Sequence, residues 1–63
     1  MRIKQPFYIG ENVRKKEGYL WPGSVVSVFL TLKMEWRIVV ECTAPEVRGA
    51  LHIFNPDQLK IVR

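Results

Sequence analysis

The chain has 63 residues, and its ten Lys and Arg against six Asp and Glu give a net charge of +4. This length suffices for one small domain, and no apolar run approaches the roughly 20 residues of a membrane-spanning helix. The single cysteine, Cys42, excludes an internal disulfide, and one Cys with one His cannot complete a structural zinc site. We therefore expect a reduced, cytoplasmic protein without metal or membrane contacts, whose charge favours anionic partners.

Turn-forming residues recur at short intervals and separate segments rich in β-branched and aromatic side chains. This spacing is typical of a small all-β barrel or sandwich. We expect an N-terminal arm over residues 1–9 and one barrel over residues 10–63. The predicted strands are residues 11–15, 24–32, 36–42, 50–55 and 60–62. Residues 56–59 are predicted to form one short helical turn that begins with proline.

The second and third predicted strands differ in pattern. In residues 36–42 the side chains alternate, and we expect the core face to carry Trp36, Ile38, Val40 and Cys42. In residues 24–32 both alternating sets are largely apolar, with Val26, Val28 and Leu30 on one face and Val25 and Phe29 on the other. One core of this size cannot cover both faces of a strand. We therefore expect another subunit to cover the second apolar face.

The fourth predicted strand, which contains the run ALHIF, holds the only histidine of the chain. Alternation along a strand places His52 and Phe54 on one face and Leu51 and Ile53 on the other. The histidine is therefore either a packed core residue, a surface residue on a strand, or one wall of a ligand site.

The register between the third and fourth strands decides what lies beside the histidine. If residues 43–49 close a symmetric hairpin, Cys42 lies opposite Leu51 and Glu41 lies opposite His52. The histidine then shares a face with a carboxylate, away from the core. The same register sends Cys42 and His52 to opposite faces, which argues against a nucleophilic Cys–His pair.

The loop around Trp21 supplies two further observations. Trp21 stands beside Pro22-Gly23, where it is suited either to anchor an interface between subunits or to fold over the end of its own barrel. The run VRKKEGYLW mixes basic and aromatic residues, as contacts to single-stranded nucleic acid require. That mixture is common on basic barrels and does not by itself predict a nucleic-acid partner.

Three stretches carry a resemblance to a known family: GENVRKKEGYLWPG (residues 10–23), VVEC (39–42) and GALHIF (49–54), followed by Leu59. With these motifs the chain resembles the type II dihydrofolate reductases, the small trimethoprim-resistant enzymes carried on plasmids. The resemblance implies an SH3-like barrel that assembles as a homotetramer around one central pore, where NADPH and dihydrofolate bind together. It also implies catalysis by positioning without a side-chain acid, since hydride passes directly between the two ligands.

The resemblance assigns site residues on this chain. The pore strand and its neighbouring cation correspond to Ala50, Leu51, His52, Ile53, Phe54 and Lys15. Trp21 corresponds to the tryptophan at the interface between dimers, and Ile53 to the residue whose backbone meets the nicotinamide amide.

Two of these positions depart from the family. His52 replaces a glutamine, and Phe54 replaces a tyrosine and so removes a hydroxyl. A neutral imidazole offers one donor and one acceptor, and it becomes donor-only when protonated. Two functions therefore stay open. One is an NADPH-dependent reductase of dihydrofolate or a similar pterin, and the other is a non-catalytic SH3-like module that binds an anionic ligand, a protein or a nucleic acid.

Overall fold

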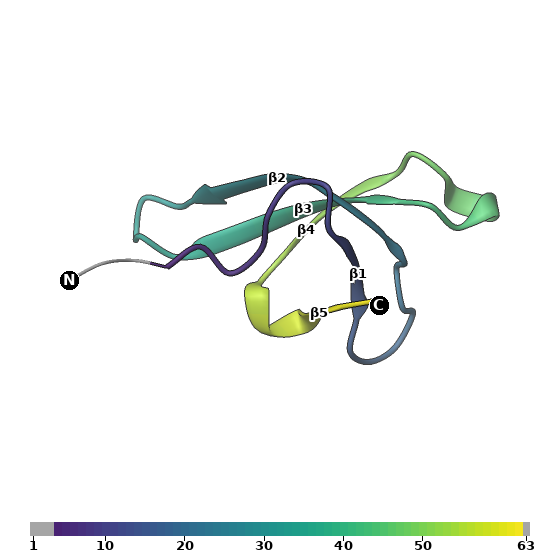
Figure 1. The fold of residues 1–63 in the computed structure, drawn as a ribbon, viewed down its shortest axis with the longest axis horizontal. Coiled ribbons are helices and arrows are strands. Elements are labelled where there is room, and N and C mark those ends of the chain that lie inside the picture. Colours follow the sequence, from purple (N-terminus) through teal and green to yellow (C-terminus); the bar gives the residue numbers. More distant parts are fainter. Residues whose placement is uncertain (1–3, 63) are drawn as a thin grey trace.

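In the computed structural model, which describes residues 4–62, five antiparallel strands form a single sheet (Figure 1). The strands are β1 (Asn12–Lys15), β2 (Gly23–Leu30), β3 (Trp36–Cys42), β4 (Leu51–Phe54) and β5 (Leu59–Ile61). Two short 3-10 turns, η1 (Pro45–Val47) and η2 (Pro56–Gln58), precede β4 and β5. None of the described residues form a helix long and apolar enough to cross a membrane. The predicted all-β class and strand number are confirmed.

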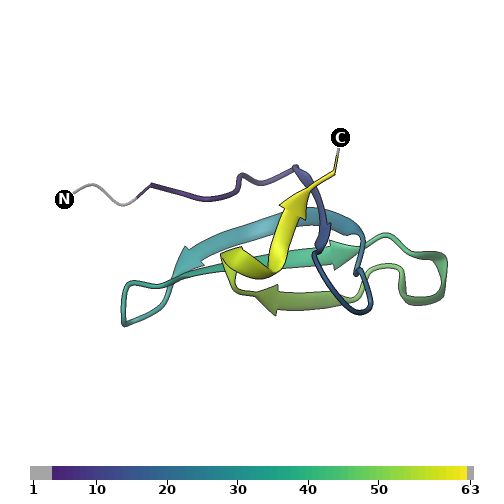
Figure 2. The same ribbon diagram turned by 90° about the horizontal axis from the view of Figure 1, so that it is seen from below.

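The strand order is β4-β3-β2-β1-β5, so β4 and β5 form the two edges of the sheet. Strands β2, β3 and β4 lie side by side, and β1 and β5 cross over one face of them (Figure 2). Over residues 4–62 the edges β4 and β5 do not pair with each other. The sheet is therefore not closed into the expected barrel.

The observed ends of the strands lie close to the predicted ends. The third predicted strand matches β3 at both ends, and the other four differ from the observed strands by at most two residues. The predicted short turn is also present: η2 has Pro56 in its first turn. Its start is held by a capping box in which the backbone N–H of Asn55 donates to Oε1 of Gln58 at 2.8 Å.

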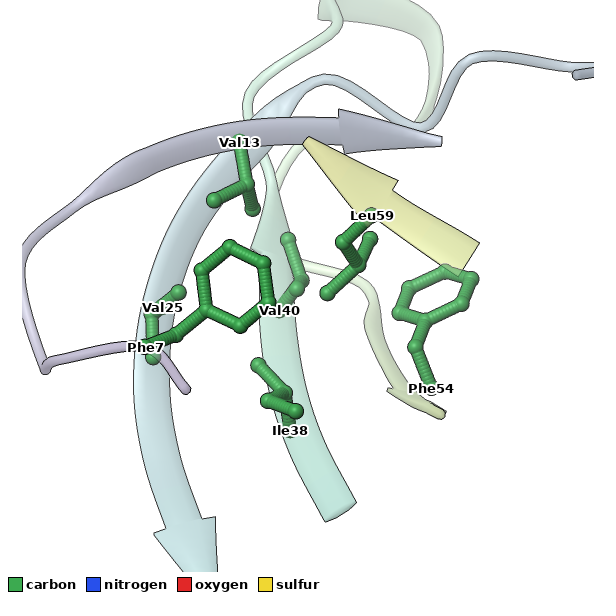
Figure 3. Packing of buried hydrophobic residues seen from close by; sticks show 7 residues of the cluster. All are labelled: Phe7, Val13, Val25, Ile38, Val40, Phe54 and Leu59. Carbon is green, nitrogen blue, oxygen red and sulfur yellow. The ribbon is translucent and has the colours of Figure 1, made fainter. Parts of the chain in front are cut away.

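The core lies between the part of the sheet formed by β2, β3 and β4 and the part formed by β1 and β5 (Figure 3). Its buried residues come from every strand and from the segment before β1: Phe7, Val13, Val25, Ile38, Val40, Phe54 and Leu59. The predicted core face of β3 is confirmed for Ile38, Val40 and Cys42, whose exposed fractions are 0%. Phe7 shows that the predicted N-terminal arm contributes to the core, while residues 1–3 of that arm and residue 63 lie outside the described residues.

A β-bulge changes which residues of β2 face the core. Val25 pairs with Val40 but Ser27 pairs with Val39, so Val26 is an extra residue in the strand. The bulge places Val25 and Val28 on the same side of the sheet. The predicted separation of these two valines onto opposite faces is wrong, because strict alternation does not continue across a bulge.

The predicted second apolar surface is present. The face of the sheet away from the core, here called the outer face, carries Val26, Phe29, Val39, Leu51 and Ile53. Leu51 and Ile53 are 61% and 53% exposed, and Val26 and Phe29 are each 38% exposed. Apolar side chains gathered on one sheet face in this way are typical of an interaction surface.

The register between β3 and β4 differs by one residue from the predicted one. Glu41 pairs with Leu51 and Val40 pairs with His52. Symmetric closure of residues 43–49 itself places Cys42 opposite Ala50 and Glu41 opposite Leu51, so the predicted pairs assigned one residue too many to the connection, which contains η1 and the left-handed Gly49 (φ 88°). Its closing hydrogen bonds run from the N–H of Cys42 to the carbonyl of Ala50 and from the N–H of Gly49 to the carbonyl of Cys42.

This register corrects the expected surroundings of the histidine. His52 lies on the same side of the sheet as Val40 and Phe54, and Glu41 lies on the other. The predicted face shared by His52 and Glu41 is therefore wrong. Cys42 and His52 are on the same side, contrary to the prediction, but the thiol is fully buried and so inaccessible to a substrate.

Candidate functional site

The histidine is part of a cluster of four rings, here called the aromatic cluster: Tyr19, Trp21, His52 and Phe54. The imidazole is stacked on the ring of Phe54, with 4.5 Å between centroids and 17° between planes. The indole of Trp21 meets His52 edge-on at 5.5 Å and Phe54 at 6.3 Å. Because Phe54 is 3% exposed and packed in the core, it gives the exposed imidazole a fixed support.

The loop before β2 holds Trp21 in place. Trp21 has a left-handed backbone (φ 45°), which is rare for an aromatic residue, and its Nε1–H donates to the carbonyl oxygen of Val40 at 3.3 Å. The ring also packs against the core of its own chain. In these contacts Trp21 folds over the end of its own sheet. Its expected role at an interface between dimers stays a prediction.

The hydrogen bond of His52 identifies which of its nitrogens carries the proton. Nδ1 lies 2.9 Å from the carbonyl oxygen of Ile53. Since a carbonyl only accepts, Nδ1 is the protonated nitrogen, and Nε2 of the neutral ring is left as an acceptor. The exposed edge of the ring can therefore accept a hydrogen bond from a ligand N–H, and it becomes a donor after protonation.

The other predicted site residues are distributed around strand β4. Leu51 and Ile53 are on the outer face, whereas His52 and Phe54 are on the core side. Ala50 lies just before the strand and is partly buried. One chain therefore brings His52, Phe54 and Trp21 together but does not direct Leu51 and Ile53 toward them. All residues of β4 lie at one free edge of the sheet.

Lys15 closes β1, where it pairs with Leu59, and it is partly buried. Its backbone N–H donates to the carbonyl of Leu20, so the basic run and the loop that carries Trp21 are joined at this point. Among the described residues, no group of three or more His, Cys, Asp or Glu side chains is placed to hold a metal ion.

The motifs behind the family resemblance lie on β1 with the following loop, on the end of β3 and on β4. No family model and no curated protein matches the chain. The likeness to type II dihydrofolate reductases therefore stays an inference from these residues.

Tyr19 was not predicted from the sequence as a site residue. The signal that could have indicated it is a second aromatic residue two positions before Trp21. Its hydroxyl donates to Oε1 of Glu46 at 3.4 Å and so links the loop before β2 to η1. Partial desolvation raises the pKa of Tyr19 above its ordinary value of about 10, and the neighbouring Cys42 and Glu46 act in the same direction.

This shift predicts how stability changes at high pH. The folded chain binds the Tyr19 proton more tightly than the unfolded chain, so the free energy of unfolding falls as pH rises past about 10. Glu46→Gln is expected to lower the pKa of Tyr19 and to reduce that loss. The phenolate absorbance, followed in a Tyr8→Phe background, measures the titration. Glu17→Gln is the control, and an unchanged Tyr19 titration in Glu46→Gln would contradict the contact.

Proposed function

We propose that this chain is a type II-like dihydrofolate reductase, in which several copies of an SH3-like sheet assemble as a homotetramer and reduce dihydrofolate with NADPH in a shared pore. The observation that carries this proposal is His52. It is an exposed ring on the free edge strand, supported by Phe54 and Trp21, with one acceptor nitrogen available to a ligand.

The residues present fit a dinucleotide and a pterin. Nε2 of His52 is suited to accept a hydrogen bond from a carboxamide N–H or from a pterin ring N–H. Lys15 and the adjoining Arg14 and Lys16 supply positive charge for phosphates and carboxylates in a chain of net charge +4. NADPH, when bound, supplies the hydride. The chain's own residues bind and orient the two ligands, as catalysis by positioning requires.

Self-association is supported by the outer face. A small domain gains stability from oligomerisation, and the apolar residues of the outer face are left uncovered by their own chain. Strand β4 forms one edge of that face, so its free edge lies next to the surface that a second copy would cover. Assembly through this region would place the β4 strands of different copies around a common space.

Turnover is the direct test. The purified protein is mixed with NADPH and dihydrofolate in the presence of trimethoprim, and the nicotinamide absorbance is followed at several pH values. We expect NADPH oxidation that depends on dihydrofolate and resists trimethoprim. The absence of turnover above background at every pH between about 5 and 8, the range over which a histidine changes charge, would refute the reductase.

Substitutions at His52 are expected to separate hydrogen bonding from packing. His52→Leu removes the acceptor and should lower kcat/KM by about 10- to 100-fold, the effect of losing one ligand hydrogen bond in a dry site. His52→Gln keeps an acceptor and should stay within a few-fold of the original. Equal rates for the leucine and glutamine variants would contradict the role of Nε2.

The second candidate is a non-catalytic SH3-like module that binds another anion. Phe54 favours this second candidate, because a buried phenyl ring offers no polar group to a substrate. Calorimetry distinguishes the two candidates. Affinity for short nucleic acids alone, falling steeply with salt as phosphate contacts do, supports the module, whereas salt-sensitive binding of NADPH supports the reductase.

A further inference from the structure

A second candidate site lies at the other end of β3 from His52. The pairing of Ile38 with Phe54 brings the residues before β3 alongside those that follow β4. Between them is an open cavity of about 320 Å³. Its lining residues are Glu35, Trp36, Arg37, Asn55, Pro56 and Asp57. None of these residues takes part in the proposed reductase site, so this inference is independent of that proposal.

The indole of Trp36, one of the residues that line this cavity, carries a hydrogen-bond donor without a partner. Its Nε1 is buried and has no hydrogen-bond partner, and no other buried side-chain nitrogen or oxygen in the described part of the chain lacks one. A buried N–H without an acceptor is costly and uncommon in folded proteins. Because Nε1 has almost no accessible surface, an acceptor atom of a ligand reaches it only after the indole ring rotates.

The charges around the cavity favour a cation. Arg37 is used within the chain, because Nη2 pairs with Oε1 of Glu35 at 3.3 Å and Nη1 donates to the carbonyl of Trp36 at 2.7 Å. Asp57 is exposed and forms no ion pair with any described residue. The cavity therefore has a net charge of one negative unit, in a protein that is otherwise basic.

We propose that this cavity binds a basic side chain of an extended peptide. The ammonium or guanidinium group pairs with Asp57 beside the Trp36 ring, where charge attraction and the cation–π interaction reinforce each other. Rotation of the indole lets a backbone carbonyl of the same peptide accept the hydrogen bond from Nε1 of Trp36. An acidic ligand is disfavoured because it would meet the carboxylates of Asp57 and Glu35.

The test follows the indole N–H signals of ¹⁵N-labelled protein by NMR during addition of N-acetyl-lysine N-methylamide. The two indole signals are assigned with the Trp21→Phe variant. We expect a saturable shift of the Trp36 signal and little change at Trp21. The norleucine analogue tests the contribution of the cation, and the glutamate analogue tests an anion.

Asp57→Asn should weaken binding of the lysine probe at least 5-fold, and Glu17→Gln, an exposed carboxylate in the loop after β1, should leave it unchanged. Asp57 is exposed, so its variant is expected to fold, and dispersed amide signals verify this. An unmoved Trp36 signal would overturn the proposal. Equal responses to the lysine, norleucine and glutamate probes would also overturn it, because the cavity would then show no preference for a cation.

Discussion

Gly23→Ala is expected to destabilise the fold severely, with the largest effect of a Cβ added at any of the four glycines. A Cβ at Gly23 would overlap the carbonyl oxygen of Glu41 and would lie 2.9 Å from Cγ1 of Val40. The nearer obstacle is the backbone of β3, which cannot rotate away as a side chain can. The β2–β3 ladder would have to open at this pair, at a cost of about 3 kcal/mol or more.

That cost is comparable to the whole stability of the domain, which is roughly 3 to 9 kcal/mol for 63 residues. Urea unfolding followed by circular dichroism measures it. Gly10→Ala is the control, because its left-handed backbone (φ 96°) is strained by alanine but no atom lies within 4 Å of the added Cβ. Folding of Gly23→Ala with the midpoint of the parent would show that β2 and β3 are not packed as described.

Phe29→Glu is expected to dissociate the assembly without unfolding the chain. Phe29 belongs to the outer face, is 38% exposed and is paired across the ladder with Arg37. A glutamate there gains an opposite charge within its own chain, which preserves the fold. In an interface the same carboxylate would be buried against apolar side chains, at a cost of several kcal/mol. We expect the mass to fall to that of one or two chains.

Light scattering gives that mass, and circular dichroism verifies that the variant is folded. Leu32→Glu is the matched control, because Leu32 is fully exposed in the turn after β2 and away from the outer face. It should leave the mass unchanged. If the mass of Phe29→Glu equals that of Leu32→Glu, the outer face is not the interface.

The strands were predictable because their signals are local. Turn residues and β-branched runs placed all five strands, and the alternation in β3 identified Ile38, Val40 and Cys42 as core. The capped turn at Pro56 was predictable for the same reason, since proline restricts the backbone wherever it occurs.

The errors came from features that depend on two strands at once. The bulge at Val26 is set by how β2 must bend to pack, and no residue type in β2 marks it. The register at His52 was predicted with eight residues between Cys42 and its partner Leu51, whereas in the structure seven residues, 43–49, separate Cys42 from Ala50, which lies opposite it. A shift of one residue changes which side of the sheet the side chains of a strand take, and so His52, which shares its face with Phe54 as predicted, lies beside Trp21 rather than Glu41.

The sequence therefore predicted which residues belong to the candidate site better than it predicted how they are arranged. His52 and Trp21 were identified from the sequence, but their contact depends on the left-handed backbone at Trp21, which the following proline does not indicate. The cavity beside Trp36 gave no sequence signal, because Glu35 and Asp57 are brought together only by the pairing of β3 with β4.

The stoichiometry of cofactor binding tests the shared pore most directly. NADP⁺ is titrated calorimetrically into protein that already holds dihydrofolate, a pair that cannot react. A pore enclosed by four copies of β4 predicts one NADP⁺ for every four chains, whereas one NADP⁺ per chain, or no binding at all, would contradict it.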